Sequence, residues 1–346
     1  MQAGLLWRPE MFRGRGHRVA AVDVWYYKIV EPGGRFARVV IPGVRTDVDP
    51  SNQYCFIRLL DGRTGSTSMH RYPYEQFWSS RDGFDVVCGN SHFSLDSLHL
   101  DIEETGLRVT GDLQFTRTPG WPVRPWAPGA MGPFAFLPFL EEYHAVINMD
   151  PRMMGVLSWD GEDIVYTGGR AYMEHDWGGS FPRAWIWTQS NHFDEDHVCL
   201  TACISDLVVG GRVVRGFIVG LLRAGVLYRW ATWNASRLVR LEKDGHHAEF
   251  TVMNDTHVLE VWSGSTTGMR QVFTSRTGDV GEMMIEELQA IVQVRLLERH
   301  AGGDILLFEG CGRNGGLEIG ADMLSLVRSA GTERSVVRAA HHPQGL

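Results

Sequence analysis

Residues 213–233 read VVRGFIVGLLRAGVLYRWATW and contain two β-rich runs, Val213–Leu222 and Val226–Trp233, joined at Ala224-Gly225. Runs of this kind, rich in branched and aromatic residues and separated by a glycine turn, are typical of antiparallel strands. The chain has 40 glycines, and similar runs alternate with Gly, Asp and Asn turns along most of its length. Segments with an apolar period of 3.6 residues are nearly absent. The sequence therefore predicts an all-β protein built as sandwiches or barrels.

One segment carries mixed signals. The first half of Glu282–Leu297 contains Met283, Met284, Glu286 and Glu287 and predicts a short helix. The second half is apolar at nearly every other position and predicts a strand.

A weak internal repeat indicates two related halves. The string Asp23-Val-Trp-Tyr-Tyr-Lys28 resembles Arg183-Ala-Trp-Ile-Trp-Thr188, and a turn and another strand follow each copy. In this alignment Trp25 corresponds to Trp185. Two copies of one β unit would explain the pattern, and a chance similarity between aromatic-rich strands is the alternative.

The length of 346 residues fits two domains of ordinary size. With the repeat, it predicts an N-terminal domain of residues 1–165 and a C-terminal domain of residues 166–346. The Pro-rich segment from Pro119 to Pro138 precedes this boundary, and together with the adjoining Phe139 it carries five aromatic residues. A disordered linker is not this aromatic, so we expect an ordered loop over the mouth of a barrel.

Composition excludes several classes of protein. The formal net charge of −8 gives no electrostatic support for nucleic-acid binding. The five cysteines are scattered without a CxxC pair, so neither a zinc ribbon nor a disulfide framework is indicated. The N-terminus lacks the apolar core of a secretory signal, and no apolar run is long enough to span a membrane. The cytosol is therefore the expected location.

The most unusual stretch is residues 168–193, GGRAYMEHDWGGSFPRAWIWTQSNHF. Strand alternation places Trp185, Trp187, Gln189 and Asn191 on one face. Two large aromatic surfaces beside two amides predict one wall of a ligand cavity, since amides in a dry core need partners. The alternative is that both amides bond to neighbouring loops at a barrel rim.

Just before this strand lie Glu174, His175 and Asp176. A carboxyl group held among aromatic rings can keep its proton near neutral pH and act as a general acid. Two alternatives remain: a solvated loop, or a metal site completed by His192 or Asp194, although the spacing matches no known ligand pattern.

A second polar group, Glu142, Tyr143 and His144, follows the apolar run Phe134–Leu140. These residues are either ordinary rim residues or part of the same cavity.

Three strings resemble the tocopherol cyclase family. The clearest is YMEHDWGGSFPRAWIWTQSN at residues 172–191, which is similar to the family's Y-x-E-K-[DN]-W-G…F-P-x-x-W-x-W-x-Q-x-N. The others are Trp25-Tyr26-Tyr27-Lys28 near the N-terminus and Leu307–Gly312 with Gly316-Leu-Glu318 near the other end. The resemblance covers roughly residues 8 to 322. Val24 replaces the family's Gly, His175 replaces its Lys, and position 176 is Asp where plant enzymes carry Asn.

The resemblance implies two lipocalin-like β-barrel halves in tandem and a reaction without redox cofactor or metal. A prenylated hydroquinone would be closed to a chromanol when an acid protonates the alkene and the phenol oxygen attacks the cation. Glu174 is the first candidate for the acid, because it matches the motif, and Asp176 is the second. The candidate substrate-binding residues are Trp25, Tyr27, Glu142, Tyr143, His144, Trp177, Trp185, Trp187, Gln189 and Asn191.

Two other functions fit the same residues. A lipocalin-like carrier would bind an apolar isoprenoid molecule without chemistry, and a hydratase would capture the cation with water. For all three functions the expected partner is an apolar small molecule, collected through transient contact with a membrane.

Overall fold

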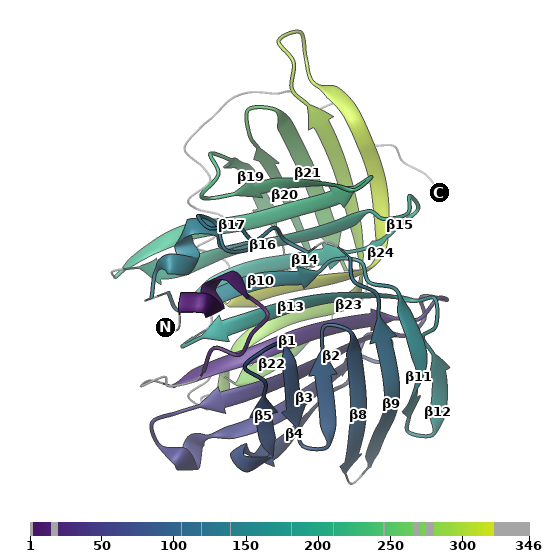
Figure 1. Ribbon diagram of the computed structural model, residues 1–346. Coiled ribbons are helices and arrows are strands. Elements are labelled where there is room, and N and C mark those ends of the chain that lie inside the picture. Colours follow the sequence, from purple (N-terminus) through teal and green to yellow (C-terminus); the bar gives the residue numbers. More distant parts are fainter. Residues whose placement is uncertain are drawn as a thin grey trace.

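The computed structural model describes residues 3–14, 20–104, 106–118, 120–138, 140–180, 182–209, 211–244, 246–265, 270–274 and 280–321. The protein is all-β, as predicted, and its described strands form three antiparallel sheets (Figure 1). Some residues named above, among them Pro119, Phe139, Phe181 and the end of the expected second domain, lie outside the described residues.

The first half of the chain forms two sheets. The first sheet has the order β10-β13-β1-β2-β3-β4 and the second β12-β11-β9-β8-β7-β6-β5. The strands of the first sheet are β1 (Ala21–Val30), β2 (Ala37–Thr46), β3 (Tyr54–Asp61), β4 (Thr67–Pro73), β10 (Glu142–Asn148) and β13 (Arg170–Gly178). Those of the second are β5 (Phe77–Ser79), β6 (Asp85–Cys88), β7 (Ser91–Ser94), β8 (Ser97–Glu104), β9 (Leu107–Phe115), β11 (Met153–Trp159) and β12 (Glu162–Val165).

The second half forms the third sheet, with the order β18-β17-β16-β14-β24-β23-β21-β20-β19. In addition, β15 pairs with β24 and β22 pairs with β23. The bounds are β14 (Ala184–Ser190), β15 (His192–Phe193), β16 (Cys199–Val209), β17 (Arg212–Arg223), β18 (Val226–Ala231), β19 (Arg237–Lys243), β20 (His247–Met253), β21 (His257–Gly264), β22 (Arg270–Thr274), β23 (Val280–Glu298) and β24 (Ile305–Ala321).

The described helices are four short 3-10 turns: η1 (Ala3–Trp7), η2 (Pro50–Asn52), η3 (Tyr74–Gln76) and η4 (Gly132–Phe136). The helix predicted for the first half of Glu282–Leu297 is wrong, because β23 runs through the whole segment and pairs with β24 from Met284 to Glu298. Sheet pairing overrides the weak local helical signal here. Within the described part of the chain, no helix combines the length and apolarity needed to cross a bilayer.

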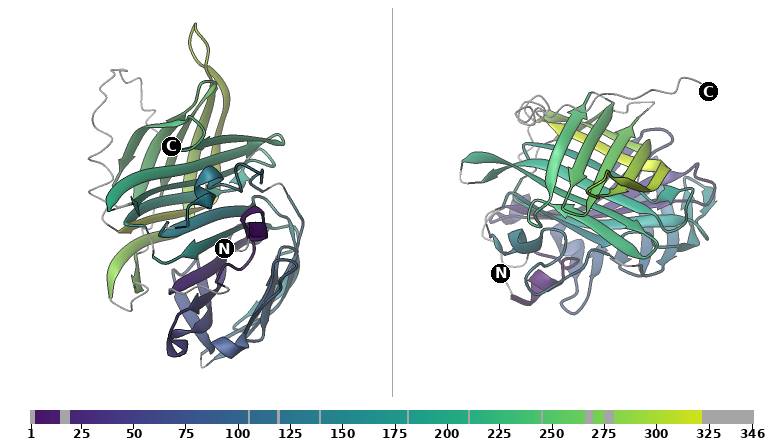
Figure 2. Two further views of the ribbon diagram at one scale, coloured as in Figure 1. Left: turned by 60° about the vertical axis from the view of Figure 1, so that its left-hand side comes forward. Right: turned by 90° about the horizontal axis from the view of Figure 1, so that it is seen from above.

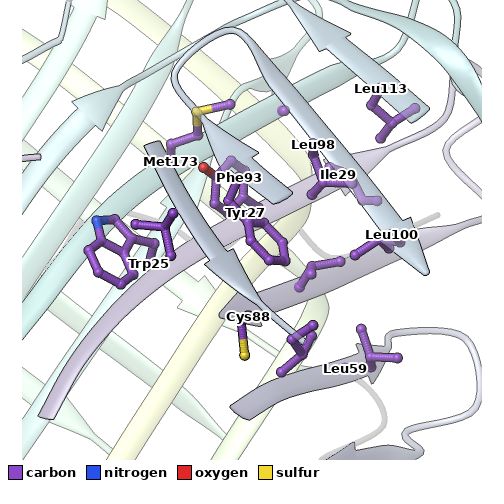
Figure 3. Packing of buried hydrophobic residues seen from close by; sticks show 14 of the residues in the cluster. Trp25, Tyr27, Ile29, Leu59, Cys88, Phe93, Leu98, Leu100, Leu113 and Met173 are labelled. Carbon is purple, nitrogen blue, oxygen red and sulfur yellow. The ribbon is translucent and has the colours of Figure 1, made fainter. Parts of the chain in front are cut away.

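The central strands of the first sheet, β1, β2 and β13, are buried on both faces. One face packs on the second sheet and forms the first core, where Trp25, Tyr27 and Ile29 of β1 meet Phe93 and Leu98 (Figure 3). The other face packs on the third sheet (Figures 1 and 2), and we call this layer the seam. Burial on both faces explains why β1 is apolar at nearly every position.

The third sheet curls around a second core, which includes Ile186, Trp230, Phe250 and Val292. Its outer face supplies Trp185 and Trp187, among others, to the seam. The seam therefore joins the outer surfaces of the two halves, and it contains side chains from strands more than a hundred residues apart in the sequence.

The two strands of the internal repeat occupy the same place in the topology of their halves. β1 pairs with the following strand β2 and with β13, and β14 pairs with the following long strand β16 and with the last strand β24. The facing of the aromatic side chains differs, however. Trp25 points into the first core, whereas Trp185 points out of the second core into the seam. The superposition of the two halves stays a prediction.

The change from one half to the other falls later than residue 165. Strand β13 pairs with β1 and β10, so residues 170–178 belong to the first sheet. The third sheet begins with β14 at Ala184. The division of the chain into two folding domains stays a prediction, but the hydrogen-bonded sheets separate between Gly178 and Ala184.

Candidate functional site

Strand β13 directs both candidate acids into the seam. Glu174 and Asp176 are two positions apart and share one face, while His175 between them points to the other. The His175 ring is fully buried on the side of the first core, where it stacks on Trp25 with the ring centroids 4.7 Å apart. Of the three residues, only the two carboxylic acids reach the seam.

His144 lies between these two carboxyl groups. It is directly opposite Asp176 in the β10–β13 ladder, its Nδ1 is 2.7 Å from Asp176 Oδ1, and its Nε2 is 3.8 Å from Glu174 Oε2. One ligand atom from each of the three residues lies within 4.8 Å of the others, and one His with two carboxylates is a set that can hold a divalent metal ion. His192 and Asp194, the expected additional ligands, are not members of this described group.

Glu174 is held in place by two hydrogen-bond donors. The Tyr172 hydroxyl donates to Oε2 over 2.7 Å, and the Trp187 indole N–H donates to the same oxygen over 3.1 Å. The residue is only 4% exposed. Burial raises the pKa of Glu174 to about 8, although the His144 ring and the Tyr172 hydrogen bond act against this rise. The carboxyl group therefore keeps its proton at neutral pH.

Asp176 differs from Glu174 in its access to solvent. Its side chain is 22% exposed, compared with 5% for the side chain of Glu174. The pKa of Asp176 is nevertheless raised, chiefly because the carboxyl group is largely buried and secondly because of the negative charge of Glu318. Its bond to Nδ1 fixes the orientation of the His144 ring.

A row of further acids continues through the seam. Glu318 of β24 accepts a hydrogen bond of 3.0 Å from the Trp185 indole and lies opposite Glu286 of β23. Burial raises the pKa of Glu286 to about 8, with a further contribution from Glu318, and it also raises the pKa of Glu318. The Arg58 guanidinium is 3.6 Å from Glu286.

The Tyr26 hydroxyl interacts electrostatically with these acids. It is buried and has no hydrogen-bond partner among the described residues. Burial raises the pKa of Tyr26, and the charges of Glu286, Glu318 and Glu174 raise it further. The interior of the seam is thus rich in groups that can exchange protons.

Sequence reasoning did not name Arg58, named Glu286 only as part of an expected helix, and named Glu318 only as part of a motif. Glu286 lies in the segment that was expected to be helical, so the sequence did not predict toward which face of a sheet its side chain points. The sequence did contain one signal for Glu318, because this residue belongs to the Gly316-Leu-Glu318 string of the family motif. In the structure, Glu318 lies on the same face of the third sheet as Trp185.

An apolar cavity of about 180 Å³ lies beside His144. It is bounded by β10, by β16 and β17 of the third sheet, and by the segment around η4, which contributes Met131 and Phe134. Phe217 and Ile218 of β17 form much of the opposite wall. The Pro-rich segment therefore covers a cavity between the two halves, whereas we expected it to cover the mouth of a barrel.

Of the residues that were expected to share one cavity, Glu142, Tyr143 and His144 line this one. The aromatic face of β14 does not. Among the described lining residues there is no Trp185, Trp187, Gln189 or Asn191. The Trp185 indole instead donates a hydrogen bond to the Glu318 carboxyl group, and the Trp187 indole donates one to that of Glu174.

The two amides bond to protein groups, as the rim alternative proposed, although they lie in the seam. Gln189 Oε1 accepts a hydrogen bond of 3.0 Å from the Lys28 ammonium, and Asn191 Nδ2 donates to the Ala171 carbonyl over 2.7 Å. Burial lowers the pKa of Lys28 to about 7. These contacts tie β14 to β1 and β13.

Three other candidates for substrate binding lie away from the cavity. Trp25 and Tyr27 belong to the first core, and the Tyr27 hydroxyl donates to the Ser94 carbonyl over 2.9 Å. Trp177 stacks on Tyr143 with a centroid distance of 5.4 Å, and the Arg13 guanidinium covers it at 4.6 Å. Trp177 therefore supports the cavity through Tyr143 and does not itself form the wall.

The part of the chain that contains this site matches a known family. A model of the tocopherol cyclase-like family matches residues 106–321, well over half of the chain. The chain belongs to the tocopherol cyclase-like family. The match contains His144 and the four acids Glu174, Asp176, Glu286 and Glu318, and it excludes β1 and Arg58.

Two plant relatives are similar over part of the chain. The chloroplastic protein of Oryza sativa subsp. japonica named as a probable tocopherol cyclase is 27% identical over 134 residues, which is 38% of this chain and 28% of that protein. The chloroplastic tocopherol cyclase of Zea mays is 28% identical over 109 residues, which is 30% of this chain and 23% of that protein. The aligned part thus spans about a quarter of each plant protein.

Solved structures share the fold at low sequence identity. A protein described as AttH from Nitrosomonas europaea has a TM-score of 0.52 at 15% identity, with 87% of this chain and 92% of that chain covered. CghA has a TM-score of 0.56 at 12% identity, with 88% of this chain and 89% of that chain covered. These structures confirm the predicted fold class of two lipocalin-like halves in tandem.

Proposed function

We propose that this protein is an acid catalyst that closes a prenylated hydroquinone to a chromanol. The observation that carries the proposal is Glu174, a buried acid with a pKa of about 8 whose Oε2 lies 3.8 Å from Nε2 of His144. His144 lines the apolar cavity, whereas Glu174 itself is not among the described lining residues. Membership in a family that includes named tocopherol cyclases supports the class of substrate. The chain aligns with about a quarter of the length of the plant proteins.

The reaction is an isomerisation, and its protons balance within the site. Glu174 supplies a proton to the alkene carbon whose protonation leaves a tertiary cation. His144 does not relay this proton, because its Nδ1 is bonded to Asp176 and its Nε2 faces Glu174. The phenol oxygen forms a bond to this cation and releases its own proton. His144 accepts that proton and returns it to Glu174, so that each group ends in its starting state. The distance of 3.8 Å between His144 and Glu174 would shorten in the substrate complex, as catalytic contacts commonly do.

The cavity suits a cationic intermediate. Tyr143, Phe217 and Trp233 are among its lining residues, and an aromatic face stabilises a nearby cation by about 1–2 kcal/mol when water is excluded. Exclusion of water also prevents hydration of the cation. A carrier would need only the apolar walls, so the protonated acid beside them favours catalysis over transport.

The volume of the cavity limits what it can enclose. A cavity of about 150 Å³ holds one benzene molecule, and the volume here is about 180 Å³. We expect the hydroquinone ring to be enclosed, while the isoprenoid tail leaves through the opening between η4 and β17. Exposed apolar lining residues such as Phe134 and Val214 mark this opening.

The direct test is to incubate the protein with prenylated hydroquinones in deuterated water and to analyse the products by mass spectrometry. A cyclase yields a product with one non-exchangeable deuterium on carbon and no added water. A hydratase yields a product that is heavier by one water molecule. Binding without any product, or an isoprenoid lipid extracted unchanged with the purified protein, would support the carrier and contradict the proposal.

Filling the cavity should weaken ligand binding without unfolding the protein. Gly216 lines the cavity, and a Cβ atom there would meet only the Thr232 hydroxyl, at 3.8 Å. We expect Gly216→Phe to weaken the binding of a prenylated hydroquinone by about tenfold or more, because the ring would occupy space that the ligand needs. Gly216→Ala adds only a methyl group and is the matched control.

Binding is measured by quenching of tryptophan fluorescence, and the melting temperature reports folding. Equal affinities for Gly216→Phe and the parent, with both folded, would place the ligand elsewhere.

A further inference from the structure

The opening of the cavity is surrounded by exposed apolar side chains. We call Trp7, Trp126, Phe134, Phe136, Val213 and Val214 the rim; each of them is at least 37% exposed. Phe134 and Val214 line the cavity as well. Clusters of exposed large apolar residues are uncommon on soluble proteins and mark binding surfaces.

The rim is continuous although its parts are distant in the sequence. The Trp7 ring of η1 packs edge-on against Phe136 of η4 with a centroid distance of 6.3 Å. The Trp7 indole N–H also donates to the Pro125 carbonyl over 3.2 Å, in the turn that carries Trp126. In Figure 1, the purple η1 lies on the same side of the molecule as the turn between β16 and β17. The cavity connects Phe134 to Val214 beside that turn.

Positive charge accompanies the rim, in contrast to the net charge of −8 of the whole chain. The Arg124 guanidinium lies 5.9 Å from the centre of the Trp126 ring. Arg229 lies close to Arg124. Burial lowers the pKa of Arg229, and the positive charge of Arg124 lowers it further. Arg212 is exposed at the start of β17, next to Val213.

We infer that the rim is a surface that inserts shallowly into a lipid bilayer with anionic headgroups. Tryptophan and phenylalanine side chains partition to the boundary between headgroups and acyl chains, and arginines at the same level attract anionic lipids. The opening of the cavity would then face the acyl chains, from which an isoprenoid ligand can enter without crossing water. This last step rests on the proposed function, whereas the contact with the membrane does not.

The test is co-sedimentation of the full chain with vesicles of phosphatidylcholine, with and without phosphatidylglycerol. We expect binding that is stronger to the anionic vesicles and weaker at high salt. The double variant Trp126→Ala/Phe136→Ala should bind about tenfold or more weakly, since it removes two inserting rings. Trp78→Ala is the matched control, because Trp78 is 53% exposed on β5 in the second sheet.

Three results would overturn the inference. The first is a parent protein that sediments with neither type of vesicle. The second is a control variant that loses as much binding as the double variant. The third is a parent that self-associates in analytical ultracentrifugation and is dissociated by the double variant, since the rim would then be an interface between copies. A protein that binds vesicles but converts no hydroquinone keeps this inference and overturns the proposed function.

Discussion

Replacing Glu174 by Gln is expected to lower the turnover of a prenylated hydroquinone by about 10²–10⁴-fold, while leaving its binding nearly unchanged. An amide has the same shape and still accepts the hydrogen bonds from Tyr172 and Trp187, but it holds no transferable proton. For the parent, turnover should fall as the pH rises through about 8, because the acid form of Glu174 is lost there. Turnover is followed by mass spectrometry and binding by fluorescence quenching.

Two further variants make the result specific. Glu309→Gln changes an exposed glutamate of β24 and should turn over at the parent rate. Asp176→Asn should reduce turnover less than Glu174→Gln, because Asp176 orients His144 through Nδ1 and does not hold the proton that is transferred. If Glu174→Gln retains the parent rate and Asp176→Asn loses it, Asp176 is the acid. If both variants retain the parent rate, neither Glu174 nor Asp176 is the acid, and His144 and Glu142 become the candidates.

The buried acids of the seam should also make the fold less stable as the pH rises. A carboxyl group of Glu286 has a pKa near 4.5 when unfolded and about 8 in the folded protein. Between these values the folded state holds a proton that the unfolded state has lost, so stability decreases with increasing pH across this window. The full contribution is present below about 4.5 and is lost through about 8.

Glu286→Gln removes this titration and should flatten the curve. A difference of one in pKa corresponds to about 1.4 kcal/mol, so we expect the variant to gain about 2 kcal/mol or more relative to the parent between pH 5 and pH 8.5. The comparison is made as a difference in the free energy of unfolding by urea, because the lowered pKa of Lys28 acts in the opposite direction above about 7. Glu309→Gln again serves as the control. If the free energy of unfolding of the parent and of Glu286→Gln changed with pH in parallel, Glu286 would be ionised in the folded protein across this pH range.

The sequence led to most of the site but assembled it incorrectly. Glu174, Asp176 and His144 were all named, because carboxylic acids and histidine among aromatic residues stand out in a β-rich chain. Trp185 and Trp187 were assigned to one face correctly, since alternation in a strand is local. Whether that face points into a barrel or out of it is set by which neighbouring sheet covers it, and no local pattern contains this information.

The repeat shows the same limit. Its two strands do occupy corresponding places in their halves, but the alignment of Trp25 with Trp185 paired an inward side chain with an outward one. A shift of one residue exchanges the two faces of a strand, and an alignment guided by aromatic residues is not sensitive to that shift. In the structure, Tyr26 and Val30 of β1 share the seam with Trp187, and the ring centroids of Tyr26 and Trp187 are 5.3 Å apart.

The amino-acid sequence alone was enough to predict the all-β class, the positions of several strands and the candidate acids, because turn residues and two-residue alternation act over a few positions of the chain. The packing of the sheets is what places the polar site in a seam between the halves, with His144 between Glu174 and Asp176. The tertiary structure also showed that the Pro-rich segment covers the cavity beside them. These contacts join β10, β13 and the third sheet across wide gaps in the sequence. The raised pKa of Glu174 follows from that packing, since it is the removal of water by both sheets together that keeps the proton on the acid.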